Sequence, residues 1–166
     1  MGYPNREVKK AVSELILPML LSKSIPDVSN EILQMRTALN AEDVDKAMLN
    51  LKQLIANTPY STQKRENFVL EEHFRFILKN IFYLCGYDIS EEKQVAAGRI
   101  DLVAKSDTII YIMELKMNDE GGVKSATRQI ATRHYADSYA ASDKRVICLA
   151  LEFGRDSRGL ERWAVI

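Results

Sequence analysis

The amino-acid sequence predicts an α/β fold, in which a small all-helical segment precedes a mixed sheet flanked by helices. Apolar residues recur at helical spacing over the first third of the chain and again after residue 67. From residue 87 the apolar period changes to two, and a helical pattern and a continuous apolar run follow the strands. The core elements are therefore expected in the order α-β-β-β-α-β.

The composition fits one ordinary domain, or a compact domain with a helical appendage. The 166 residues are 46% hydrophobic, and Lys+Arg and Asp+Glu both total 23. This balance excludes the strong basic field of a dedicated nucleic-acid binder. Cys85 and Cys148 stand in apolar runs, so we expect buried thiols and a reducing, cytoplasmic setting. No apolar run approaches the roughly 18 residues of a membrane span, so no membrane association is expected.

Three helices are expected in the N-terminal segment. The first spans about 6–22, and the Ser-Ile-Pro stretch at 24–26 should stop it. Ser29 or Asn30 is expected to cap the second helix. Asn40 resembles the cap of a third, which ends before residue 57.

A polar, turn-rich stretch at 59–67 is expected to separate the helical segment from the core. We therefore divide the chain into a segment at 1–58 and a domain at 59–166. A long helix should open the core at about 67–85, with Gly86 as its C-terminal stop.

The rest of the core is expected to be a hairpin, a third strand, a helix, a buried strand and an edge strand. The hairpin is indicated by a short Ala-Ala-Gly turn. The expected ranges, in that order, are 87–95, 99–104, 108–117, 123–140, 145–153 and 160–166.

Three charged residues stand inside the most strand-like stretch of the sequence. Glu114 and Lys116, two apart, project from one face of their strand, while Met113 and Leu115 project from the other. A modest register of the neighbouring strand puts Asp101 beside Glu114. Two adjacent carboxylates repel unless a cation lies between them, and Mg²⁺ or Mn²⁺ prefers such oxygen donors.

Lys116 would be no ligand in such a site. Its ammonium can stabilise charge developing on a phosphate or position the attacking water. A metal would lower the pKa of a bound water, so the arrangement predicts phosphodiester hydrolysis. The alternative interpretation is a cross-strand ion pair on a solvated face, since such pairs are common.

These residues resemble the PD-(D/E)xK nuclease superfamily, which has the restriction-endonuclease-like fold. The signature Asp and the (Asp/Glu)-x-Lys tripeptide match Asp101 and Glu114-Leu115-Lys116, and Glu71 matches a helical Glu that commonly precedes them. The resemblance implies Mg²⁺ or Mn²⁺ bound by the two strand acids, Glu71 and the main-chain carbonyl of Leu115. It also implies a nuclease acting on DNA.

The closer resemblance, over about 59–166, is to a bacterial subgroup with several further short motifs. Its members often carry Gln-Ile on the next helix, and Gln129 is the matching candidate for catalysis. The superfamily's Pro before the first Asp is replaced by Ile100. The matching segments are Glu71-Glu72-His73-Phe74, Gly98-Arg99-Ile100-Asp101, Gln129-Ile130 and Arg158-Gly159-Leu160-Glu161-Arg162-Trp163.

Members of that subgroup often carry an AAA-ATPase-like module N-terminal to this domain. No Walker A pattern occurs here, so the resemblance implies an ATPase partner or a missing module. A homodimer would suit a junction-resolving activity, because two sites must meet two strands. The competing class of function is a catalytically silent nuclease-fold module that acts in interaction or regulation alongside an ATPase.

Several other residues keep two interpretations. Glu72 competes with Glu71 for the acidic role, and His73 either touches the site or packs under it. His134 is expected to be structural or at the surface. Gln129 and Arg133 share a helix face, which is either exposed or used to hold water or phosphate.

Basic residues are the remaining candidates for nucleic-acid contact. Trp163 and Phe153 are expected to pack in the core instead of stacking on bases. The basic residues either solubilise the chain or form a patch that follows phosphates: Lys64, Arg65, Arg75, Lys79, Arg99, Lys105, Lys124, Arg128 and Arg155.

Overall fold

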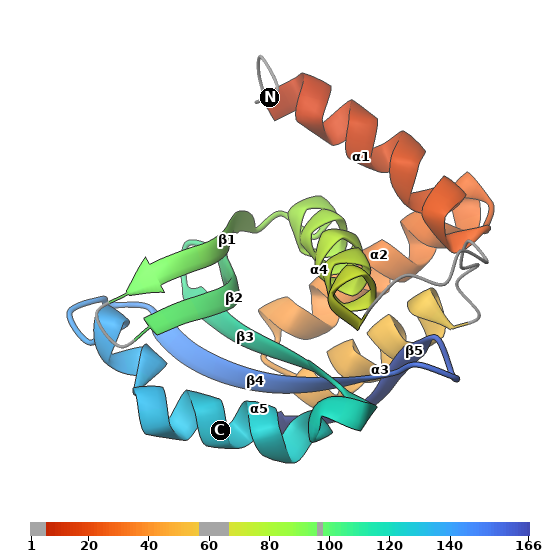
Figure 1. Ribbon diagram of the computed structural model, residues 1–166. Helices are drawn as coiled ribbons and strands as arrows, with labels where there is room; N and C mark the ends of the chain where they lie inside the picture. Colours follow the sequence, from red (N-terminus) through yellow and green to blue (C-terminus); the bar gives the residue numbers. More distant parts are fainter. Residues whose placement is uncertain (1–5, 57–66, 96–97) are drawn as a thin grey trace.

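A computed structural model describes residues 6–56, 67–95 and 98–166, and in these ranges helices cover both faces of a five-stranded sheet (Figure 1). The strands lie in the order β1-β2-β3-β4-β5. The β3–β4 pair is parallel and the other pairs are antiparallel, so the sheet is mixed as expected. Their bounds are Asp88–Val95, Gly98–Lys105, Ile109–Met117, Arg145–Gly154 and Gly159–Val165.

The helices lie in two groups, one on each face of the sheet (Figure 1). Helices α1 to α4 precede the sheet in sequence, and α5 lies alone on the opposite face from α4. The bounds of α1 to α5 are Arg6–Leu21, Ile25–Asn40, Val44–Ile55, Asn67–Leu84 and Gly122–Arg133. Short 3-10 turns at Asn118–Glu120 and Tyr135–Tyr139 flank α5. The predicted α/β fold class, a restriction-endonuclease-like core after a helical segment, is confirmed.

Each face of the sheet has its own apolar core. Helices α1 to α4 share one core with the strand residues that face them, such as Met113 and Leu115. On the other face, Ala126 and Ile130 of α5 pack with Ile112 and neighbouring strand residues. The N-terminal helices and the sheet are thus continuous through one core. The division after residue 58 stays a prediction, because its boundary falls outside the described residues.

Two helix starts differ from the expectation. The Ser-Ile-Pro stretch does not merely stop α1, because Ser24 itself caps α2: its hydroxyl accepts a hydrogen bond from Asp27 N–H at 3.2 Å. Pro26 is tolerated in the first turn, where its missing N–H costs nothing. The cap of α3 is Asp43, which accepts from Lys46 N–H, and not Asn40, which ends α2. The predictions of Ser29, Asn30 and Asn40 as caps were therefore wrong.

The helix after β3 ends earlier than the expected 140. His134 adopts a left-handed conformation with φ 46° and ψ 46°, which terminates α5 at Arg133. The chain then forms a 3-10 turn that places Tyr135 in the interior, fully buried. The long helix before the sheet ends as expected, at Gly86 with φ 96°. An apolar pattern alone does not show where the backbone changes hand.

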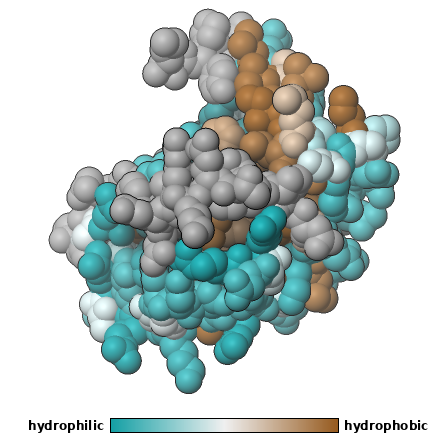
Figure 2. Space-filling model, turned by 45° about the vertical axis from the view of Figure 1, so that its right-hand side comes forward, coloured by the Kyte–Doolittle hydropathy of each residue, from teal (hydrophilic) through white to brown (hydrophobic). Residues whose placement is uncertain are grey.

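Helix α1 keeps part of its apolar surface uncovered. Leu15 and Met19 are 61% and 79% exposed, whereas Leu17 is fully buried against the core. Apolar side chains accordingly gather on the surface over the N-terminal helices (Figure 2). Across the part of the chain that is described, we find no helix with the length and apolar character needed to cross a membrane.

Candidate active site

Asp101 of β2 and Glu114 of β3 lie close together, with α4 contacting Asp101 through Arg75 and α5 contacting Glu114 through Gln129. The antiparallel ladder of β2 and β3 ends at the pair Leu102 and Met113, and Asp101 and Glu114 are the next residues of the two strands beyond that end. The main-chain N–H of Leu115 donates a 2.9 Å hydrogen bond to Asp101 Oδ2. The end of the ladder and this hydrogen bond bring the two acids near each other, and their role as site residues stays a prediction.

Glu114 is a fully buried carboxyl in this cluster. Gln129 Nε2 donates to its Oε1, and Lys116 Nζ lies 3.6 Å from the same atom. Its Oε2 is buried and has no hydrogen-bond partner among the described residues. Burial, reinforced by the nearby charge of Asp101, raises the pKa of Glu114 to about 8. The fold therefore holds a carboxyl that can lose its proton only at a cost.

Arg75 links the other two acids of the site. Its Nη2 lies 2.9 Å from Glu71 Oε1 and 3.8 Å from Asp101 Oδ1, and all three side chains are largely buried. Glu71 and Arg75 are one helical turn apart on α4, which makes the pair local. Burial raises the pKa of Glu71, while Lys116 opposes that shift. Two positive charges thus face three carboxyl groups.

Helix α5 orients Glu114 through a short hydrogen-bond network. Gln129 Nε2 also donates to the Tyr135 hydroxyl at 3.1 Å, and that hydroxyl donates to the main-chain oxygen of Arg99 at 2.7 Å. Arg133 Nη1 approaches the same hydroxyl at 3.4 Å. The left-handed residue after α5 turns Tyr135 inward, so the network depends on the early end of the helix.

A hard divalent cation such as Mg²⁺ fits the chemistry of this cluster. The donors are carboxylate oxygens, and Glu114 Oε2 is a buried acceptor without a partner. Asp101, Glu114, Glu71 and the main-chain oxygen of Leu115 are the groups that would hold it. Within 6–56, 67–95 and 98–166, no three or more His, Cys, Asp or Glu side chains are grouped as metal ligands. In this structure Arg75 contacts two of these acids, Glu71 and Asp101.

The other sequence candidates fall in different places. Glu72 is exposed and lines a cavity with Arg75, Phe76 and Glu91, whereas Glu71 pairs with Arg75 beside Asp101 and is the helical acid of the cluster. Burial lowers the pKa of His73, whose ring lies edge-on to that of the neighbouring Phe74. His134 is exposed and structural, as the terminus of α5 requires.

The two aromatic residues near the chain end pack as expected. Phe153 is buried and stacks on Phe74 with ring centroids 4.5 Å apart. Trp163 packs against the edge of the core and donates from Nε1 to Asp45 at 2.9 Å.

The described basic residues do not form one patch. Lys79 pairs with Glu91, Arg155 pairs with Asp119, and Lys105 lies over the Tyr139 ring. Lys64 and Arg65 lie outside the described residues. Lys124 and Arg128 lie together on an exposed flank of α5.

Two residues of the site were not singled out from the sequence as part of it. Arg75 was placed only among the basic residues, although its four-residue spacing from Glu71 is typical of a helical ion pair. No sequence pattern predicted the contact of Tyr135 with Gln129. The helix was expected to continue to residue 140, and six residues apart on one helix the two side chains would not be neighbours.

The fold and the cluster of acids with a lysine define the chain as a nuclease-like α/β protein. The family model described as the PD-(D/E)XK nuclease superfamily matches residues 69–163, more than half of the chain, and the chain belongs to that superfamily.

The chain is also similar to a protein described as an uncharacterized protein in the vnfD 5′ region of Azotobacter chroococcum mcd 1. The two are 26% identical over 166 residues, which cover 99% of this chain and 32% of the relative. The chain therefore spans about a third of the length of this curated relative. No solved structure matches the chain.

Proposed function

We propose that the domain is a divalent-metal-dependent nuclease that hydrolyses phosphodiester bonds, with DNA as its substrate. The observation that carries the proposal is the fully buried Glu114 carboxyl, whose Oε2 lacks a partner while Asp101 and Lys116 lie beside it. A buried acid of this kind is costly unless a cation or a reaction makes use of it. Membership of the nuclease superfamily supports the same conclusion.

Each residue has a separate task in this proposal. Asp101 and Glu114, with Glu71 and the Leu115 main-chain oxygen, hold the cation. When bound, Mg²⁺ or Mn²⁺ supplies Lewis acidity and a water of lowered pKa. Lys116 stabilises the negative charge that develops on the phosphate oxygens as the water attacks.

Gln129 acts through Glu114. Its side-chain N–H donates to Oε1 of Glu114, and Oε2 is then the oxygen available to bind the cation. The Tyr135 hydroxyl fixes Gln129 in turn. These contacts position the acid, and they need no contact with the substrate.

Cleavage of plasmid, single-stranded and branched DNA with Mg²⁺ or Mn²⁺ tests the proposal. Asp101→Asn and Lys116→Met should each lower the rate by about 10²-fold or more, since each removes a charge at the reacting phosphate. Asp107→Asn and Lys46→Met make the same chemical changes at exposed positions outside the cluster and should leave the rate unchanged. Cleavage that persists in both site variants would reject the assignment.

A second candidate function is a silent nuclease-fold module that acts in interaction or regulation. The specific observation in its favour is Arg75, which contacts both Glu71 and Asp101 where a cation would compete. Such a module need not bind a divalent cation. A titration with Mn²⁺ therefore separates the two functions.

The wider setting is also part of the proposal. An ATPase-like partner or module, a homodimer and a cytoplasmic location all stay predictions. The two free, buried cysteines are compatible with a reducing compartment. The chain spans about a third of the length of its curated relative.

A further inference from the structure

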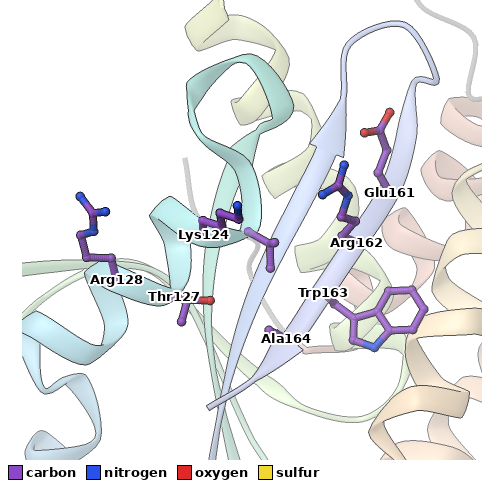
Figure 3. Close-up of a pocket in the computed structure, with 8 residues that line it drawn as sticks. Lys124, Thr127, Arg128, Glu161, Arg162, Trp163 and Ala164 are labelled. Carbon is purple, nitrogen blue, oxygen red and sulfur yellow. The ribbon is translucent and has the colours of Figure 1, made fainter.

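A groove on the outer flank of α5 has a lining that includes none of the residues of the acidic cluster. It has a volume of about 630 Å³ and runs between α5 and the edge strand β5 (Figure 3). Val123 and Ala164 contribute apolar surface, and Thr127 contributes a hydroxyl. Its charged lining residues are Lys124, Arg128, Glu161 and Arg162.

The positive charges of this groove are only partly compensated. Lys124 and Arg128 are exposed, and neither side chain forms an ion pair with a residue of the described chain. Arg162 Nε lies 3.4 Å from Glu152 Oε1, yet the side chain remains 68% exposed. The carboxylate of Glu161 accepts from Ser157 Oγ at 2.8 Å. In a chain of zero net charge, the groove is a local excess of positive charge.

Several other cations of the described chain are paired with carboxylates and do not add to this excess. Lys23, Arg75, Lys79, Arg145 and Arg155 each lie within 4 Å of a carboxylate. Two uncompensated cations on one helix flank, four residues apart, are about 6 Å apart along the helix axis. That spacing is comparable to the separation of successive phosphates along one nucleic-acid strand.

The groove lies close to the acidic cluster in the sheet. Lys116 of β3 is in register with Glu152 of β4, which is in register with Arg162 of β5. Two strand spacings, about 10 Å in all, therefore separate Lys116 from Arg162. Glu152 is no barrier to an anion, because it accepts from Val123 N–H at 2.7 Å and pairs with Arg162.

We propose that this groove binds the phosphate backbone of nucleic acid at a position remote from the scissile bond. The inference rests on the proposed nuclease function, and it adds a second contact to that function. A polyanion held at Lys116 needs to extend only about 10 Å to reach Arg162, which lines the groove together with Lys124 and Arg128. The groove therefore lengthens the binding surface without contributing to the chemistry.

Affinity for DNA, measured with the full chain in EDTA so that no hydrolysis occurs, tests this inference. The probes are a labelled duplex and a labelled single strand, each titrated over a range of salt concentrations. The double variant Lys124→Gln, Arg128→Gln should weaken binding about 50-fold near 0.1 M salt and lower the salt slope by about 2, one per lost phosphate contact. The control Arg36→Gln, Lys46→Gln removes the same charges at exposed sites of α2 and α3, and should change neither.

Four outcomes decide between the groove and its alternatives. An equal loss of DNA affinity in the two double variants would show that the effect depends only on net charge, and would contradict binding in the groove. An acidic peptide that binds wild type and is lost only in the groove variant, with DNA affinity unchanged, would assign the groove to a protein partner and also overturn it. If wild type cleaves DNA and the groove variant binds it normally, the proposed function survives alone. If wild type neither binds nor cleaves DNA, both fail.

Discussion

Glu114 shows how one buried side chain concentrates chemistry in this fold. A carboxyl with no exposed surface would ordinarily be removed from a core or fully hydrogen-bonded. Here Gln129 and Lys116 satisfy only Oε1. The protein therefore retains an acid whose ionised form is poorly stabilised by its own residues, and whose ionisation a bound cation would favour.

Stability against pH should reveal this burial. The raised pKa means that the folded state binds the Glu114 proton more tightly than the unfolded state, so unfolding releases it between pH 4.5 and about 8. The contribution of Glu114 to the free energy of unfolding is thus full below that window and is lost as pH rises through it. Glu114→Gln cannot titrate, and should gain roughly 2–4 kcal/mol relative to wild type across the window.

Chemical denaturation at a series of pH values measures that difference. Glu7→Gln, at an exposed position of α1, controls for the loss of one carboxyl. Parallel stability curves for wild type and Glu114→Gln would show that the carboxyl is already compensated inside the fold.

At the residue scale, the sequence was most informative where strand alternation operates. It predicts that Glu114 and Lys116 share a face and that Asp101 lies next to them. Lys116 Nζ lies 3.6 Å from Glu114 Oε1, and the β2–β3 ladder ends one residue from both acids. It did not predict that Arg75 bridges Glu71 and Asp101, because that contact joins a helix to a strand distant in sequence. Side-chain geometry between elements depends on packing that spacing does not encode.

At the scale of elements, α5 connects the site to its surroundings. Its inner residues pack on the sheet, Gln129 contacts Glu114, and its outer flank forms one side of the basic groove. Its left-handed terminus at His134 then directs Tyr135 beneath Gln129. The helix is therefore a shared support, and its length matters to the site.

The terminus of α5 makes a distinct stability prediction. His134 is exposed with φ 46°, a conformation that costs non-glycine residues energy. His134→Gly should raise the free energy of unfolding by roughly 0.5–1 kcal/mol. Ala131→Gly, in the exposed interior of the same helix, should lower it by about 1 kcal/mol. Thermal and chemical unfolding would decide, and equal destabilisation by both would argue that the helix continues through His134.

Element types were predictable from period, whereas several boundaries were not. The change from helical to alternating spacing located the strands and the long helix α4. The caps of α2 and α3 were misplaced because Ser, Asn and Asp occur close together there, and only the backbone shows which side chain accepts an N–H. The end of α5 depends on the left-handed conformation of His134, which no pattern of apolar residues predicts.

At the scale of the whole molecule, the helical segment and the sheet share a core. Leu17 of α1 is fully buried in the same apolar cluster as the sheet residues that face α4, whereas Leu15 points outward. A sequence-based division after residue 58 therefore separates parts that pack together.

Two leucines of α1 test this joint core. Leu17→Ala should lower the free energy of unfolding by about 3 kcal/mol, because it leaves a cavity in a closed environment. Leu15→Ala makes the same chemical change in the same helix at a position 61% exposed, and should alter stability by about 0.5 kcal/mol or less. A single cooperative transition in the wild-type denaturation curve is expected as well. Equal effects of the two substitutions would show that α1 is not docked.

Calorimetric titration of the full chain with Mn²⁺ tests the central claim most directly. Wild type should bind the ion, and more tightly as pH approaches 8, because binding must release the Glu114 proton. Lys116→Met should still bind, since the lysine is no ligand, but should cleave DNA more slowly by about 10²-fold or more. Asp101→Asn should lose binding. Equal binding by wild type and Asp101→Asn, or none by either, would contradict a metal centre built from Asp101 and Glu114.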